Sequence, residues 1–439
     1  MNEEISDYRL QGYYKRKLNL PQYSYAKVLR AQRNCGARVI HFPQTTPAVF
    51  VVSNGEQSKI LGAQFCDSSW SCPVCSSKEM ARYASRIASA IDALYEQFDE
   101  VGFMMTFTVP HHHNWSCQQV YDILRETWKN FVKNANAKKR PNDVFGRFCK
   151  EFSCYHRIKV GEFTWGYYGW HPHYHCLFFV NKNRLNEVKS WQQEISDRWF
   201  TLAKKATIKI LKRDNFCENV EQMINDYYES KKSKIQQTKE AVISLNDDGT
   251  VRAAKSSEYI CGWGADKELT GNIRKQASHK GHFTPHQLLK KAYELDNDGK
   301  TTNNERADKY FRRYVEYAIA TKGTYRIKMS SILTKIIDEW RATHPNIQTQ
   351  KKISEDTTPK TFHLVVWFTK EQWCKIYYLE IIDEILLLAK ETNGKKLIEQ
   401  LLLKHHIDIT KNGRYPSTKF LPKCYQEMTA TDISDYNIA

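Results

Sequence analysis

The alternation of apolar and polar positions predicts a sheet flanked by helices. A short apolar run at residues 102–109, closed by a proline, is typical of a buried central strand. Residues 77–98 before it and about 117–134 after it carry apolar residues at helical spacing, as do residues 183–205 further on. We expect another strand at residues 207–211. This order predicts an α+β domain with a central antiparallel sheet covered on one side by helices.

Residues 161–180, GEFTWGYYGWHPHYHCLFFV, predict a β-hairpin whose turn lies between Gly166 and Gly169. That register gives the cross-strand pairs Val160–His175, Glu162–His173 and Thr164–His171. Side chains alternate along a strand, so the three histidines point to one face and share it with Glu162. The hairpin therefore brings a carboxylate next to imidazoles.

Two imidazoles and one carboxylate, with positions left open, suit a divalent ion that also binds a phosphate oxygen. We expect Glu162, His173 and His175 to be the ligands. His171 lies nearer the turn, and three roles stay open for it: ligand, support for the ligands, or phosphate contact. The alternative is that the histidines only pack, but three alternating histidines facing a glutamate are hard to explain by packing. The adjacent residues His111–His113 are expected to lie in a loop or contact DNA.

A second candidate metal site is built from cysteines. Cys66, Cys72 and Cys75 have the spacing C-x5-C-x2-C, and the end Cys-Pro-Val-Cys resembles a zinc knuckle. A closed structural zinc site takes four ligands, and Cys35 is the best candidate for the fourth. The alternative is a set of unrelated buried cysteines. We expect Zn²⁺ with a structural role.

Charge and aromatic content point to nucleic acid. The chain has 66 Lys and Arg against 49 Asp and Glu, a net charge of +17, which favours a polyanionic partner. Aromatic residues make up 13% of the chain and offer stacking surfaces for single-stranded nucleic acid. No apolar run is long enough for a membrane span, and the first residues lack the pattern of a signal peptide. We expect a cytoplasmic protein with no membrane partner and reduced cysteines.

At the histidine motif the sequence resembles a family. HPHYHCLFFV resembles the His-hydrophobic-His motif of the HUH endonuclease superfamily, in the extended form found in replication initiators of rolling-circle plasmids. The strand GFMMTFTV looks like the first motif of these initiators, and residues 256–275, SSEYICGWGADKELTGNIRK, are similar to the third. Residues 310–333 look like their closing block, which is expected to form a helix, a turn and an edge strand. The cysteines also resemble a zinc-binding segment that precedes the nuclease core in some initiators.

The resemblance implies an activity and its residues. Tyr259 would be the nucleophile of site-specific DNA nicking and joining through a 5′-phosphotyrosine, with Mn²⁺ or Mg²⁺ at the histidine motif. Glu258 or Glu268 would activate water for the closing step; the sequence does not choose between them. The reaction would initiate rolling-circle plasmid replication on origin DNA that is single-stranded at the nick, with a host helicase and polymerase as partners. The alternatives are an HUH transposase of a mobile element and a non-catalytic, zinc-containing DNA-binding regulator.

Changes in composition along the chain suggest domain boundaries. We expect an N-terminal region with the zinc knuckle and a basic helix at residues 1–98, a nuclease domain at 99–342, a linker at 343–360 and a mainly helical region at 361–439. Within the nuclease domain, residues 228–257 are expected to form a surface insertion with one hairpin. The last region should contain a strand and at least two amphipathic helices, which bind DNA, a subunit or a helicase, or cap the core.

Overall fold

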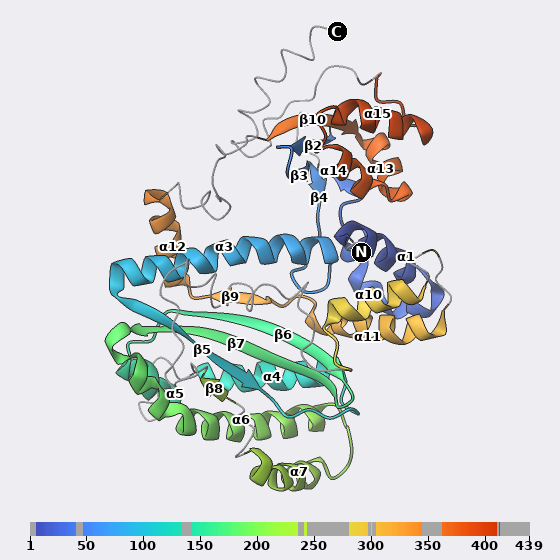
Figure 1. Ribbon diagram of the computed structural model, residues 1–439. Helices are drawn as coiled ribbons and strands as arrows, with labels where there is room; N and C mark the ends of the chain where they lie inside the picture. Colours follow the sequence, from blue (N-terminus) through green and yellow to red (C-terminus); the bar gives the residue numbers. More distant parts are fainter. Residues whose placement is uncertain are drawn as a thin grey trace. The chain divides into compact units, whose positions relative to one another are not determined.

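The computed structural model describes residues 6–40, 47–133, 143–235, 241–243, 281–296, 300, 304–344, 362–410 and 412 (Figure 1). Contacts within the chain divide it into two compact units. Unit 1 comprises residues 1–68, 72–75 and 349–439, and unit 2 comprises residues 69–71 and 76–348. No helix in the described ranges is both long enough and apolar enough to cross a membrane.

Unit 2 is built on a five-stranded antiparallel sheet with the order β8-β5-β7-β6-β9. Its strands are β5 (Glu100–Thr108), β6 (Arg157–Gly166), β7 (Gly169–Asn181), β8 (Ala241–Ile243) and β9 (Ile327–Met329). The strand predicted at residues 102–109 is therefore β5, and its central position is confirmed. The predicted helix, turn and edge strand at residues 310–333 are confirmed as well, because β9 forms one edge of the sheet.

The helices of unit 2 begin with α3 (Pro73–Phe98), whose first three residues belong to unit 1, and continue with α4 (Cys117–Val132), α5 (Val144–Glu151), α6 (Gln192–Arg213) and α7 (Val220–Ile235). They continue with α10 (Pro285–Leu295), α11 (Glu305–Thr321) and α12 (Ser331–Thr343), and residues Lys182–Trp191 form a 3-10 helix. The predicted α+β class with a central antiparallel sheet is confirmed. A polar first turn fixes the start of α4, where Ser116 and Gln119 form a reciprocal capping box.

Helices pack on both faces of this sheet. On one face, Met104 of β5 and Leu177 of β7 pack with Ile91 of α3 and with residues of α12. On the other face, Phe107 of β5 packs against Phe131 of α4 and Trp199 of α6, with ring centroids 5.3 and 4.7 Å apart. We expected helices on only one face of the sheet, and this was wrong. Both alternating sets of side chains on β5 and β7 are apolar, so each face of the sheet is buried under helices.

The prediction of a strand at residues 207–211 was also wrong, because these residues belong to α6. Thr207 Oγ1 donates to the carbonyl oxygen of Ala203 at 2.8 Å, a bond across one helical turn. Ala203, Thr207 and Ile210 are buried together, at the spacing of one helix face. The β-branched residues of this stretch favoured a strand, but packing of that face determined a helix. Residues 228–235, expected within an insertion, are the end of α7, and β8 extends the sheet.

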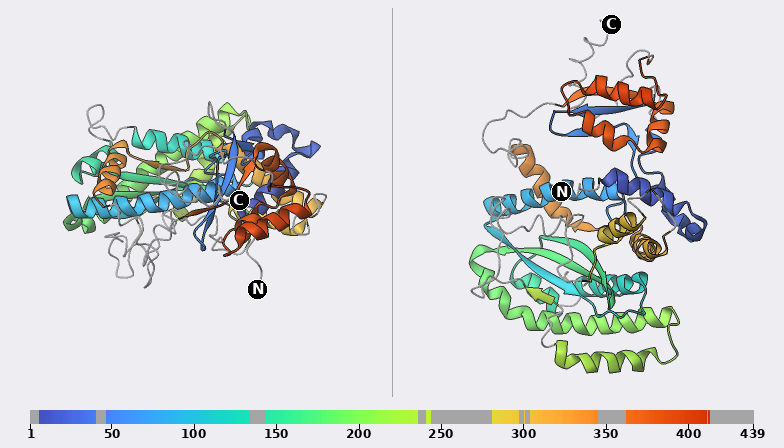
Figure 2. Two further views of the ribbon diagram at one scale, coloured as in Figure 1. Left: turned by 90° about the horizontal axis from the view of Figure 1, so that it is seen from above. Right: turned by 45° about the vertical axis from the view of Figure 1, so that its right-hand side comes forward.

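Unit 1 contains a three-stranded antiparallel sheet with the order β10-β2-β3 and a two-stranded β1-β4 ribbon. Its elements are α1 (Asp7–Leu18), a 3-10 helix (Pro21–Leu29), α2 (Arg30–Arg33), β1 (Arg38–Val39), β2 (Ala48–Ser53), β3 (Ser58–Leu61), β4 (Ala63–Gln64), β10 (His363–Thr369), α13 (Lys370–Leu379), α14 (Ile382–Leu388) and α15 (Gly394–Lys404). The predicted strand and amphipathic helices after residue 361 are confirmed. Figure 2 shows from two further directions that α13, α14 and α15 lie beside these strands.

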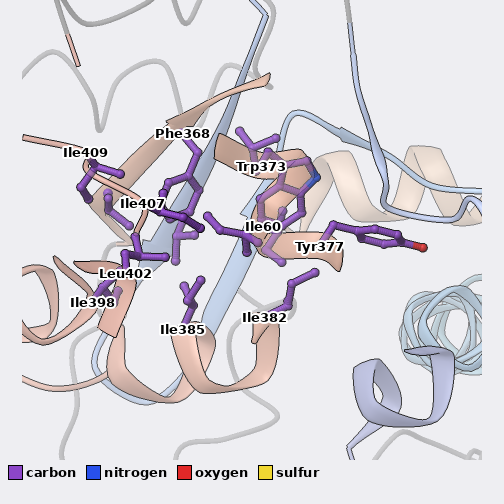
Figure 3. Packing of buried hydrophobic residues seen from close by; sticks show 14 of the residues in the cluster. Ile60, Phe368, Trp373, Tyr377, Ile382, Ile385, Ile398, Leu402, Ile407 and Ile409 are labelled. Carbon is purple, nitrogen blue, oxygen red and sulfur yellow. The ribbon is translucent and has the colours of Figure 1, made fainter. Parts of the chain in front are cut away.

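The core of unit 1 is formed by segments from the N-terminal and the C-terminal parts of the chain. Strand β10 pairs with β2, so Phe368 lies opposite Val49. Trp373, Ile385 and Leu402, one from each of the three helices, pack on this face of the sheet (Figure 3). The indole nitrogen of Trp373 donates to the carbonyl oxygen of Gly36 at 2.8 Å. Burial of these large side chains holds the C-terminal helices to the N-terminal strands.

Candidate metal centres

Strands β6 and β7 form the predicted hairpin (Figure 1). Its register is the one predicted from its turn. Its pairs include Val160–His175, Glu162–His173 and Thr164–His171, as expected. The turn holds Tyr167 and Tyr168, and Gly169 follows with φ +90°. A Cβ at Gly169 would also meet the backbone of His113 at 2.9 Å, so glycine is required there for two reasons.

Glu162, His173 and His175 meet on one face of this hairpin. Oε2 of Glu162 lies 3.3 Å from Nε2 of His173 and 3.4 Å from Nε2 of His175. One ligand atom from each residue lies within 4.8 Å of the others. The glutamate is only 5% exposed, which is unusual for a carboxylate outside a paired or metal-binding site. The three side chains thus form a compact donor set of two nitrogens and a carboxylate, the set that hard and borderline divalent ions accept.

Thr106 of β5 supports this group, and sequence reasoning did not find it. Its Oγ1 lies 2.9 Å from Nδ1 of His175, and the two residues are cross-strand partners. With a metal ion bound, donation from Nδ1–H to this hydroxyl would direct the Nε2 lone pair of His175 to the ion that Glu162 also binds. A signal existed in the Thr-x-Thr end of the strand, but the pairing of β5 with β7 joins residues far apart in the chain.

The electrostatics of the group follow from its burial. Burial alone would raise the pKa of Glu162, but hydrogen bonds to His173 and His175 outweigh it and hold the pKa well below its usual range. Burial lowers the pKa of His173, against the opposing effect of Glu162. The histidine therefore tends toward the neutral imidazole that binds metals, and the glutamate toward the carboxylate.

His171 lies beside the group, not in it. Its ring centroid is 5.3 Å from that of His173 and 4.7 Å from that of His111. Burial, followed by the charges of His173 and His111, lowers the pKa of His171 well below its usual value. The loop residue His111 is held in turn by Tyr227, whose hydroxyl donates to its carbonyl oxygen at 3.2 Å. A direct ligand role for His171 stays a prediction.

The remaining residues of the predicted active site lie outside the described ranges. Tyr259, Glu258 and Glu268 all belong to residues 244–280, for which the structure gives no description. Their roles as nucleophile and as activators of water stay predictions.

The four predicted cysteines come together in unit 1. One sulfur each from Cys35, Cys66, Cys72 and Cys75 lies within 4.8 Å of the others. Cys35 Sγ is 3.4 Å from Cys75 and 3.5 Å from Cys72, and Cys66 is 3.6 Å from Cys75. Four sulfurs at about 2.3 Å from one zinc ion form a tetrahedron with edges of about 3.8 Å. The observed spacings approach this value, so the group fits one tetrahedral ion.

Polar groups around the cysteines also fit thiolates. The backbone nitrogens of Cys66 and Cys75 donate to the sulfurs of Cys35 and Cys72 at 3.4 and 3.5 Å. Burial raises the pKa of Cys72 well above its usual value, so a thiolate there needs a compensating cation. As a protonated thiol, Cys72 donates instead to Oε1 of Gln11 in α1, at 3.4 Å.

Comparison with known proteins identifies the family. A family model described as Rep_1, replication protein, matches residues 57–304, more than half of the 439 residues. No curated protein and no solved structure matches the chain. The matched range includes the hairpin with Glu162, His173 and His175. The chain therefore belongs to the Rep_1 replication protein family, which indicates a replication initiator that acts on plasmid origin DNA.

Proposed function

We propose that this protein is an HUH-type endonuclease that nicks and rejoins one strand of origin DNA, and so initiates rolling-circle replication. The observation that carries the proposal is the buried Glu162 carboxylate, placed 3.3 and 3.4 Å from the Nε2 atoms of His173 and His175. Membership of a replication protein family supports the choice of DNA as substrate. Net charge +17 supports it as well.

The chain's own residues prepare this site for a divalent ion. Glu162, His173 and His175 would hold Mn²⁺ or Mg²⁺, and Thr106 orients His175 through its other ring nitrogen. The ion, when bound, would polarise a phosphodiester oxygen and stabilise the charge that develops on the phosphate. His171 and His111, whose rings lie beside the group, would contact the flanking phosphates.

Tyr259 is proposed as the nucleophile. Its phenolic oxygen forms a bond to phosphorus while the bond from phosphorus to the 3′ oxygen breaks. The phenolic proton leaves to a base or to solvent, and the departing oxygen takes up a proton to become a 3′ hydroxyl. That hydroxyl then serves as primer for a host polymerase, with a host helicase opening the duplex. Glu258 or Glu268 would take the proton from the water that ends the cycle.

The four-cysteine group is proposed to bind Zn²⁺ for stability and not for reaction. Its sulfurs supply four ligands, so no position is left for substrate. Cys35 precedes the C-x2-C pair by 37 residues and Cys66 precedes it by six, so one ion ties separate segments of unit 1 together. Metal bound in this way contributes directly to the free energy of folding.

A cleavage assay with matched histidine variants tests the proposal. Wild-type protein with Mn²⁺ should cut a labelled single-stranded origin oligonucleotide. His173→Ala should lose that cleavage, because one of three ligands is gone. The control is His363→Ala, which changes an exposed histidine of unit 1 that belongs to neither metal group. Full cleavage by His173→Ala would overturn the assignment of the metal centre.

A further inference from the structure

A polar pocket lies in unit 2, on the sheet face opposite to the one that carries Glu162, His173 and His175. It has a volume of about 470 Å³. Lys159 of β6 and Tyr174 of β7 line it, together with Trp128 of α4, Tyr325 and Lys328. Lys159 is three positions from Glu162, and Tyr174 is adjacent to His173, so strand alternation directs these side chains away from the metal centre. The pocket is thus separate from the site described above.

Two lysines of this pocket face each other without a counter-charge. Lys159 and Lys328 are cross-strand partners on β6 and β9, and side chains in this relation share a face. Like charges placed directly opposite destabilise a sheet. Among the residues that the structure describes, neither lysine forms an ion pair with a carboxylate. An anion bound between the two lysines would attract both ammonium groups and so offset their mutual repulsion.

The acidic residues that line the pocket are already paired with other cations. Asp122 lies 3.0 Å from Arg213 and 3.5 Å from Arg125. Glu126 lies 2.6 Å from Lys209. Because these carboxylates are paired elsewhere, the sheet side of the pocket, with Lys159 and Lys328, stays positively charged.

Lys159 also lies in an apolar, aromatic environment. Its ammonium nitrogen is 3.8 Å from the centroid of the Tyr174 ring and 5.5 Å from that of Trp128. The pKa of Lys159 is lowered to about 8, mainly by burial, and the nearby charges of Lys328 and Arg125 act in the same direction. A partly buried lysine held against aromatic rings and beside a second lysine is a candidate for binding an anion.

An exposed aromatic ring completes the pocket. Tyr325 is 78% exposed, although the preceding residue, Thr324, is held by hydrogen bonds. Thr324 accepts a hydrogen bond at its Oγ1 from the Tyr121 hydroxyl at 3.0 Å, and its carbonyl oxygen accepts one from the Trp70 indole nitrogen at 3.1 Å. The backbone next to Tyr325 is therefore held in place, while the ring itself is exposed and has a face available for stacking.

We propose that this pocket binds one nucleotide unit, with its phosphate between Lys159 and Lys328 and its base stacked on Tyr325. Cations that follow phosphates, combined with aromatic rings that stack on bases, are the elements of single-strand recognition. The volume lies within the range of pockets that hold small ligands. Either a nucleotide within a DNA strand or a free nucleoside phosphate supplies this chemistry. The proposal does not depend on cleavage, because it uses the opposite face of the sheet.

Binding measurements with the full chain test this site. The probes are labelled oligo-dT of about twelve nucleotides, followed by fluorescence anisotropy, and dTMP, followed by calorimetry, both without added Mn²⁺ or Mg²⁺. Lys328→Gln should weaken oligonucleotide binding about tenfold and reduce its salt dependence by about one phosphate contact. The control is Lys335→Gln, which changes an exposed lysine of α12 that does not line the pocket.

A stability measurement separates binding from folding. Lys328→Gln removes a like-charge contact, so its melting temperature should equal or exceed that of the wild type. Tyr325→Ala changes a ring that is mostly exposed, so it should weaken binding and leave the melting temperature unchanged. Loss of affinity for both probes would assign the pocket to free nucleotides, and loss for the oligonucleotide alone would assign it to a DNA strand.

Unchanged affinity of Lys328→Gln and Tyr325→Ala for both probes would overturn the nucleotide site. That result would leave the proposed endonuclease untouched, because cleavage is tested separately with His173→Ala. Conversely, a wild type that binds through the pocket but never cuts origin DNA would refute the endonuclease and retain the pocket.

Discussion

The hydroxyl of Thr106 lies 2.9 Å from Nδ1 of His175, on the imidazole whose other nitrogen faces Glu162 at 3.4 Å. The strand β5 thereby orients a metal ligand that belongs to β7. A hydrogen bond of this kind fixes both the tautomer and the ring position of a ligating histidine.

Removing that hydroxyl should weaken metal binding without unfolding the protein. We expect Thr106→Val to lower Mn²⁺ affinity about 10- to 100-fold, because His175 loses the partner that sets its tautomer. The side chains have nearly the same shape, so far-UV circular dichroism should not change. Thr106→Ser keeps the hydroxyl and serves as the control. Equal Mn²⁺ affinity in Thr106→Val and wild type, measured by titration calorimetry, would show that the hydrogen bond has no such role.

Removal of the Tyr259 hydroxyl tests the proposed role of this residue as the nucleophile. Wild type with Mn²⁺ should form a DNA adduct that survives denaturing electrophoresis, with the 5′ phosphate mapped to Tyr259 by peptide analysis. Tyr259→Phe removes the attacking oxygen, so it should form no adduct and make no cut while still binding the oligonucleotide. An adduct on Tyr227 or Tyr228 would assign the nucleophile elsewhere. Cutting by wild type with no adduct at all would indicate hydrolysis and refute the phosphotyrosine route.

Loss of one zinc ligand should lower both metal content and stability. Cys72→Ser removes a buried sulfur from the four-cysteine group, so bound zinc should fall and the melting temperature should drop by several degrees. Cys217→Ser changes an exposed cysteine outside the group and should alter neither quantity. Metal content is measured by mass spectrometry of the purified protein. If Cys72→Ser retained the zinc of the wild type, the cysteines would not form the site.

Stability should depend on pH through His286 of α10. Burial, and then the charge of Arg326, lowers the pKa of His286 to about 3. The unfolded chain takes up the proton near the ordinary value of about 6.5, so this stabilisation is complete above pH 6.5 and is lost as the pH falls toward 3. The loss at pH 5 is about 2 kcal/mol.

The variant His286→Met isolates this contribution. Its side chain cannot take up a proton, so its free energy of unfolding should fall less between pH 7 and pH 5 than that of the wild type. Urea denaturation at the two pH values measures the difference. His156→Met, which changes a partly buried histidine beside Glu100 on the sheet, provides a comparison at another site. Parallel losses in wild type and His286→Met would exclude the buried histidine as the cause.

Much of the histidine centre is determined by local sequence. The turn between Gly166 and Gly169 fixes which residues of β6 and β7 stand opposite each other, and alternation then places Glu162 with His173 and His175 on one face. The C-x2-C pair at Cys72 and Cys75 likewise needs only a short stretch of chain. Such features are readable because the groups that interact are close in sequence and the backbone geometry between them is restricted.

Other features were decided only by tertiary structure. Thr106 contacts His175, and Lys159 faces Lys328, because separate strands align in one sheet. Residues 207–211 became helical because one face of α6 packs on the core, and helices cover both faces of the sheet because both faces are apolar. Strand β10 joins β2 from the far end of the chain. The alignment of these distant segments is driven by the apolar surface that they bury together, a quantity that depends on the whole fold and that no local pattern contains.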